Sequence, residues 1–167
     1  AVFWHSFRER EGIEVIIWKL AAFLAWHGQE ELWHMVQSAR QIGSQLPPPE
    51  TLFDYVLQMA EGRGYLLCFD DLHLVEKDPL LIRLVGRLRA ALGSGGLALV
   101  ITTRRVLSFL QTAEADSLAG LSAEDARLLL ERWGLRLPDA LFERLYAHTG
   151  GNAQFLTLAM NVLQPET

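Results

Sequence analysis

The stretch Gly64-Tyr-Leu-Leu-Cys-Phe-Asp-Asp-Leu-His-Leu-Val75 decides the fold. Its apolar run, from Tyr65 to Phe69, follows a glycine and ends at two adjacent carboxylates, Asp70 and Asp71. A continuous apolar run of this length is typical of a strand buried in a parallel sheet. Because ligands of open parallel sheets bind beyond the carboxyl ends of the strands, the two aspartates predict a site for a hard cation such as Mg²⁺. An Asp-rich turn that only caps the next element explains the same residues equally well.

The composition predicts a globular protein with a real hydrophobic core. The chain has 167 residues, enough for one domain or one domain with a small appendage, and 50% of them are hydrophobic. A net charge of -5 argues against a nucleic-acid surface, because binding to phosphates needs clustered Lys and Arg. The cluster of Arg83, Arg87 and Arg89 is better explained as a solvated helix face. A single cysteine, Cys68, excludes a disulfide within the chain, and no apolar run approaches the roughly 20 residues of a membrane helix. We therefore expect a cytoplasmic protein without a membrane partner.

Strands and helices are expected to alternate through the first part of the chain. A second continuous apolar run, Leu97–Ile101, also ends in polar residues, and a further short strand is expected near the start. Asp78 and Pro79 predict a helix start, with aspartate as the N-cap. Three consecutive prolines predict a stiff, non-helical linker over residues 45–50. The expected strand at the start covers residues 2–7, and the expected helices cover residues 13–27, 32–42, 51–61 and 79–92.

Helices dominate the rest of the predicted structure. A short helix is expected over residues 106–110 and a short strand over residues 117–119, followed by helices that begin after Ser122, at Pro138 and after Asn152. Ser122 and Asp125 form a capping-box pattern with aspartate in place of the usual glutamate. The economical architecture is an α/β parallel sheet in residues 1–120, followed by a small C-terminal helical cap in residues 121–167.

Taken together, the two strand tips resemble the core of a P-loop ATPase. The tip with Asp70 and Asp71 resembles the Walker B strand, and the tip Thr102-Thr103-Arg104 resembles the sensor strand. More specifically, the chain resembles the signal-transduction ATPases with numerous domains (STAND), relatives of the NB-ARC regulators. The matching segments follow the order of that family and cover residues 3–8, 66–73, 100–104, 118–130 and 150–156. The resemblance implies a three-layer P-loop NTPase-like parallel sheet with a helical cap.

The resemblance also implies roles for residues of the strand tips. Asp70 would lie near Mg²⁺, and Asp71 would polarise the water that attacks the terminal phosphate. Arg104, helped by Thr103, would sense the phosphates. The expected cofactors of the intact protein are therefore ATP and Mg²⁺, with ATP and ADP as its small-molecule partners.

A second nucleotide contact is implied in the helical cap. STAND proteins usually carry a Gly-x-Pro signature whose proline lies against the adenine base. The matching residues are Gly151, Asn152 and Ala153, so alanine stands where the family has proline. The resemblance places these residues at the nucleotide, with a weaker adenine contact.

One element of the family is absent from the sequence. No segment matches Gly-x-x-x-x-Gly-Lys-Ser/Thr, the loop whose amides and lysine hold the phosphates. In the family this loop precedes the strand that matches residues 2–7, so it would lie upstream of Ala1. We expect the chain to be the distal part of a longer ATPase, without the first strand and P-loop and inactive alone. A relative that has lost the loop and acts as a non-catalytic protein-interaction domain is the alternative.

The missing first strand would leave one edge of the sheet open. In the family that strand lies beside the sensor strand, here Leu97–Ile101, and an unpaired buried backbone group costs about 1 to 3 kcal/mol. We expect either the strand at residues 117–119 to fill the position or a second copy of the chain to pair there. The partners expected from sequence are thus nucleotide in the intact protein and protein partners or self-association at the open edge.

Overall fold

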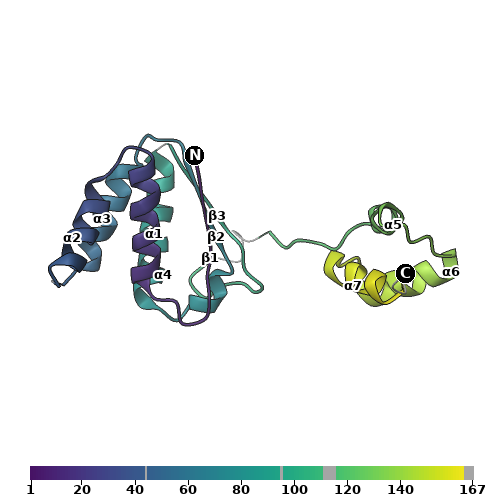
Figure 1. Cartoon of the computed structure of the whole chain (residues 1–167). Helices are drawn as coiled ribbons and strands as arrows, with labels where there is room; N and C mark the ends of the chain where they lie inside the picture. Colours follow the sequence, from purple (N-terminus) through teal and green to yellow (C-terminus); the bar gives the residue numbers. More distant parts are fainter. Residues whose placement is uncertain (44, 95, 111–115, 164–167) are drawn as a thin grey trace. The chain divides into compact units, whose positions relative to one another are not determined.

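The computed structural model describes residues 1–43, 45–94, 96–110 and 116–163. The chain divides into two compact units, Ala1–Ala115 and Asp116–Thr167. The first unit contains the sheet and the helices of the first part of the chain, and the second contains the C-terminal helices (Figure 1). The boundary between them lies a few residues before the one expected from the sequence.

The first unit is built on a parallel sheet. Among the described residues the sheet has three strands in the order β1-β2-β3, with β1 spanning Val2–Ser6, β2 Tyr65–Asp70 and β3 Leu97–Ile101. In register, Ser6 pairs with Asp70, and Phe69 pairs with Ile101. The apolar runs that predicted strands form them, and the α/β class with a parallel sheet and C-terminal helices is confirmed.

Helices cover one face of this sheet. They are α1 (Ile13–Trp26), α2 (Glu31–Gln41), α3 (Pro49–Ala60) and α4 (Pro79–Ala91), with short 3₁₀ helices η1 (Leu72–Val75) and η2 (Leu92–Ser94). All four α-helices lie on the same side of the strands in Figure 1. As predicted, the Asp78 side chain caps α4, because its Oδ1 accepts hydrogen bonds from the amides of Leu80 (2.8 Å) and Leu81 (3.3 Å).

The prediction of a non-helical linker over residues 45–50 is wrong at its end. Helix α3 begins at Pro49, so Pro49 and Glu50 are helical. Proline lacks an amide hydrogen, but the first amides of a helix have no intrahelical acceptor in any case. The third proline of the run therefore starts the helix, with no loss of a hydrogen bond.

The two faces of the sheet differ in burial. Phe3 and His5 of β1, and Phe7 directly after it, are buried on the side of the helices. Val2 and Trp4 on the opposite face are each 60% exposed. The core under the helices includes the fully buried side chains of Phe53 and Phe69. Of the three layers that a P-loop NTPase fold implies, the described residues therefore supply the sheet and one helical layer.

Two short elements expected on either side of the boundary between the units are wrong. Residues 106–110 form a turn instead of a helix, closed by a 3.0 Å hydrogen bond from the Leu110 amide to the Leu107 carbonyl. A segment of this length is too short to be stable as a helix by itself. Leu107 is fully buried in the core, and Phe109 and Leu110 pack against it from the turn. Residues 117–119 form no strand, and Leu118 is almost fully exposed. Within the described residues, nothing adds to β3, which is an edge strand.

The second unit consists of three helices in its described part. Helices α5 (Ala123–Arg132), α6 (Asp139–Thr149) and α7 (Ala153–Leu163) enclose a small core of Ala126, Leu130, Phe142, Leu156 and Met160. The predicted caps are confirmed, because Ser122 Oγ accepts from the Asp125 amide (3.1 Å) and Asn152 Oδ1 accepts from the Gln154 amide (3.0 Å). No helix among the described residues of either unit is long and apolar enough to cross a membrane.

Candidate functional site

The carboxyl ends of the three strands place a row of oxygen-bearing side chains on one face of the sheet. This face lies opposite α1 to α4, and no described helix of the first unit covers it, so we call it the uncovered face. Ser6 ends β1, Asp70 ends β2 and Thr102 follows β3. Side chains alternate along a strand, and the register pairs Ser6 with Asp70, so these two lie on the same face. The Thr102 amide donates to the Phe69 carbonyl (2.9 Å), which continues the ladder and brings Thr102 beside Asp70.

Asp70 lies at the centre of this row and accepts a hydrogen bond on each carboxylate oxygen. Ser6 Oγ donates to Oδ2 at 2.8 Å, and Thr102 Oγ1 donates to Oδ1. Donors to a carboxylate stabilise its ionised form. The hydroxyl of Thr102, and after it that of Ser6, lowers the pKa of Asp70 below its ordinary value. Asp70 is therefore a fixed anion at neutral pH.

Asp71 lies next to this row, where the chain turns out of the strand. Its backbone is left-handed, with φ 55° and ψ 33°, a conformation that aspartate tolerates better than most residues. Its amide donates to Thr102 Oγ1 at 3.3 Å, which ties the turn to β3. The carboxylate Oδ1 lies 3.7 Å from Arg104 Nε and 3.7 Å from His73 Nδ1. Since Arg104 is 80% exposed, its attraction to Asp71 is screened by water and leaves the guanidinium accessible.

The structure thus brings together three of the residues expected at the strand tips, Asp70, Asp71 and Arg104. Thr103 points elsewhere, since its hydroxyl donates to the Arg105 carbonyl at 2.7 Å. The threonine in contact with the acidic pair is its neighbour Thr102. Sequence reasoning assigned no role to Thr102 or Ser6. The period of two along each strand is the signal that could have placed them on one face.

The residues expected in the cap, Gly151, Asn152 and Ala153, belong to the second unit. Asn152 serves as the N-cap of α7, which begins at Ala153. The Gly151 carbonyl accepts from the Leu121 amide at 2.8 Å, and a Cβ on Gly151 would lie 2.2 Å from the Leu121 carbonyl oxygen. These contacts therefore support the fold of the second unit.

The chemistry of the strand-tip donors fits a hard divalent cation. Asp70 and Asp71 supply carboxylate oxygens, and the hydroxyls of Ser6 and Thr102 add neutral oxygens nearby. Mg²⁺ is commonly held by one or two carboxylates, with water and phosphate oxygens completing its shell. Within the described residues there is no group of three or more His, Cys, Asp or Glu side chains arranged for a metal. Water or phosphate oxygens would have to provide the remaining ligands.

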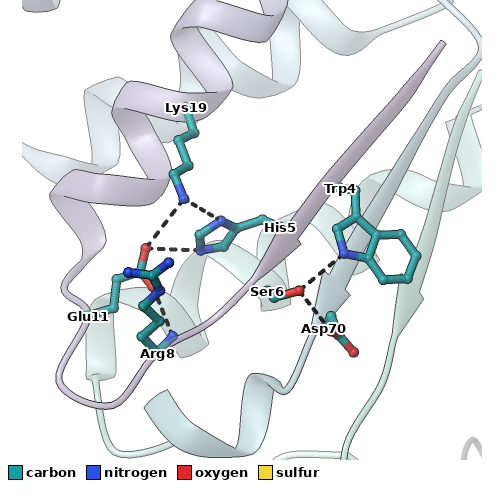
Figure 2. Close-up of polar contacts among 7 residues, drawn as sticks. All are labelled: Trp4, His5, Ser6, Arg8, Glu11, Lys19 and Asp70. Atoms are coloured by element: carbon teal, nitrogen blue, oxygen red, sulfur yellow. Dashed lines mark hydrogen bonds and ion pairs between the residues drawn. The ribbon is translucent and has the colours of Figure 1, made fainter.

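A second polar cluster lies on the helix-facing side of β1 (Figure 2). His5 is only 2% exposed, and its Nε2 lies 3.1 Å from Glu11 Oε1 while its Nδ1 lies 3.0 Å from Lys19 Nζ. The Arg8 amide donates to Glu11 Oε2 at 2.9 Å. Burial, as the largest cause, lowers the pKa of His5. This cluster fastens the loop after β1 to α1. It could not be found from the sequence, because its members are not spaced as metal ligands.

Comparison with known proteins gives one informative result. No protein-family model matches the chain, and no curated protein matches it significantly. Among solved structures, the chain is similar to a signal-transduction ATPase with numerous domains (STAND) protein with a tetratricopeptide repeat sensor from Pyrococcus horikoshii. The TM-score is 0.66 at 20% sequence identity, over 99% of this chain and 25% of that chain. The chain therefore spans a quarter of the length of that protein, and its fold is that of part of a STAND ATPase.

Proposed function

We propose that the chain is the distal part of a STAND-type ATPase module, which in the intact protein binds ATP and Mg²⁺ and acts as a signalling switch. The observation that carries this proposal is the cluster at the carboxyl edge of the sheet, where Asp70 is held by two hydroxyls and Asp71 lies beside Arg104. Open parallel sheets bind their ligands at this edge. The fold match to part of a STAND ATPase supports the proposed class of protein.

In this proposal each charged residue of the tip has one role. Asp70, an anion with both oxygens fixed, would hold Mg²⁺ directly or through its water shell. Asp71 would orient and polarise the attacking water. Arg104, exposed and only loosely paired with Asp71, would turn to the terminal phosphate when nucleotide binds. Mg²⁺ would supply charge neutralisation at the phosphates.

The isolated chain is expected to be inactive. Its sequence has no Gly-x-x-x-x-Gly-Lys-Ser/Thr loop, so it lacks the amides and the lysine that hold the phosphates in this class of ATPase. Gly151, Asn152 and Ala153 of the second unit remain proposed as the adenine-side contact of the intact protein. Thr103, whose hydroxyl donates to the Arg105 carbonyl in this structure, remains proposed as the residue that assists Arg104.

Arg104 provides the sharpest test of the proposal. In the intact protein, titrated with a fluorescent ATP or ADP analogue and Mg²⁺, Arg104→Ala should weaken ATP binding by about 10-fold or more and leave ADP binding nearly unchanged, since a charged hydrogen bond contributes about 1.5 to 3 kcal/mol. Arg105→Ala is the matched control, because Arg105 pairs with Glu76 at 2.5 Å instead of Asp71. Equal losses for ATP and ADP would refute the sensing role.

A non-catalytic interaction domain is the second candidate function. The observation that favours it is the uncovered face of the sheet, where Val2, Trp4 and Val100 are exposed beside an open edge strand. Exposed apolar strand edges recruit further strands or a second copy of the chain. Light scattering on the chain alone tests this candidate: concentration-dependent dimers support it, and a monomer at all concentrations contradicts self-association at β3.

A further inference from the structure

We infer that Ser6 is a positioning residue for Asp70 and that the Trp4 indole sets the direction of the Ser6 hydroxyl. The functional role of this arrangement rests on the proposed function, in which Asp70 faces Mg²⁺. The arrangement itself is observed as hydrogen bonds along one face of the neighbouring strands β1 and β2. Figure 2 shows Trp4, Ser6 and Asp70 in a continuous chain of hydrogen bonds.

The direction of the chain follows from the donor chemistry. An indole N–H can only donate, and Trp4 Nε1 donates to Ser6 Oγ at 3.2 Å. The serine hydroxyl has one proton, which cannot be directed at the indole. It is therefore directed at Asp70 Oδ2, 2.8 Å away. Hydrogen bonds in such a chain polarise one another, so the indole strengthens the bond that Ser6 gives to the carboxylate.

The same logic applies to the other carboxylate oxygen. The Asp71 amide, which can only donate, lies 3.3 Å from Thr102 Oγ1, so the threonine proton is directed at Asp70 Oδ1. Two hydroxyls, each oriented by an N–H donor, thus hold the two oxygens of Asp70. The carboxylate cannot rotate without breaking both bonds. Each oxygen still has a lone pair for a cation or a water.

This inference gives a reason for an exposed tryptophan. Trp4 is 60% exposed on the uncovered face, so burial in the core does not explain its place. Trp18 on α1 and Trp33 on α2 differ in this respect, since they pack edge to face at 5.5 Å. Trp26 at the end of α1 is exposed like Trp4. The indole N–H, and not the ring alone, is the part of Trp4 that acts on the strand tip.

The test measures the titration of the Asp70 carboxyl by ¹³C NMR on the full chain without nucleotide, with the signal assigned through Asp70→Asn. Ser6→Ala should raise the pKa of Asp70, because it removes a donor to the ionised form. Ser6→Thr keeps the hydroxyl and should restore the wild-type titration. Trp4→Phe keeps an aromatic ring but removes the indole N–H, and should raise the pKa by less than Ser6→Ala does. Thr102→Val is the positive control.

Two outcomes would overturn the inference. An Asp70 titration that is unchanged in Ser6→Ala would remove the positioning role, and one that is unchanged in Trp4→Phe would remove the role of the indole. A purely structural role predicts loss of stability in these variants with no change in titration. Because the measurement needs no nucleotide, it is independent of the proposed function: failure of the intact protein to bind Mg-ATP would leave the titration result intact.

Discussion

Replacing single glycines of the second unit by alanine should separate two destabilising effects, which both act at Gly151. One is the strain of a left-handed backbone, and the other is the steric clash of the added Cβ. Gly151 has a φ of +73°, and a Cβ there would lie 2.2 Å from the Leu121 carbonyl oxygen. Gly150 has a φ of +56° with no atom within 4 Å of the added Cβ, and Gly120 would bring its Cβ to 2.0 Å from the Gly150 carbonyl oxygen. Gly150→Ala therefore isolates the backbone cost, Gly120→Ala isolates the steric cost, and Gly151→Ala combines them.

The expected magnitudes follow from these geometries. A left-handed backbone costs a residue with a Cβ about 1 to 2 kcal/mol, which is the whole effect expected for Gly150→Ala. Forcing a methyl group against backbone that must shift costs about 1 to 3 kcal/mol, which is the effect expected for Gly120→Ala. The sum for Gly151→Ala is about 2 to 5 kcal/mol, a large share of the stability of a small helical unit.

Hydrogen exchange of the full chain, followed by mass spectrometry, measures these losses locally. Peptides from α5, α6 and α7 should exchange faster in Gly150→Ala and Gly120→Ala than in the wild type, and fastest in Gly151→Ala. Peptides from α1 to α4 provide an internal reference. Each tenfold loss of protection corresponds to about 1.4 kcal/mol. Equal losses for Gly150→Ala and Gly151→Ala would refute the close backbone approach of the Gly150-Gly151 turn to the segment before α5.

Two further predictions concern the first unit. Asp78→Ala removes both hydrogen bonds that the Asp78 side chain accepts at the start of α4. The free energy of unfolding, measured by urea denaturation, should fall by about 1 kcal/mol. In Asp78→Ser, which keeps a capping oxygen, most of this stability should be retained. Burial lowers the pKa of His5 from 6.5, so the unfolded chain binds a proton more readily than the folded one. The stability of this unit should therefore be full above pH 6.5 and fall as the pH decreases toward the lowered value. Urea titrations between pH 7.5 and 5 test this, and His5→Gln should flatten the profile in that range; an equally steep profile in the variant would assign the effect to other groups.

Local sequence signals were sufficient to predict the strands and helix starts that depend on a few neighbouring residues. The apolar runs that end at Asp70 and Thr102 formed neighbouring parallel strands, and Asp78, Ser122 and Asn152 capped the helices expected of them. In each case the evidence lies within a few residues: a change from apolar to polar side chains, or an acceptor placed to meet free amides. Predictions of this kind hold because they depend on residues that are close in the sequence and not on tertiary contacts.

Features that depend on distant contacts were missed. Ser6 reaches Asp70 only because β1 pairs with β2 in one particular register, which a single strand does not encode. His5 is buried beside Glu11 because α1 folds over the strand, so its role is likewise set by tertiary packing. The short segments 106–110 and 117–119 have too little apolar periodicity to decide between turn, helix and strand. In the second segment Leu118 remains exposed, without a sheet partner among the described residues.

The central claim is that the Asp70 tip is the cation side of a nucleotide site completed by residues outside this sequence. Calorimetry with Mg-ATP tests it most directly, on this chain and on a chain extended upstream in the source gene, each with and without Asp70→Ala. The prediction is no binding by this chain, binding by the extended chain, and loss of that binding in Asp70→Ala. Binding by this chain alone, or binding by the extended chain that is unaffected by Asp70→Ala, would contradict the claim.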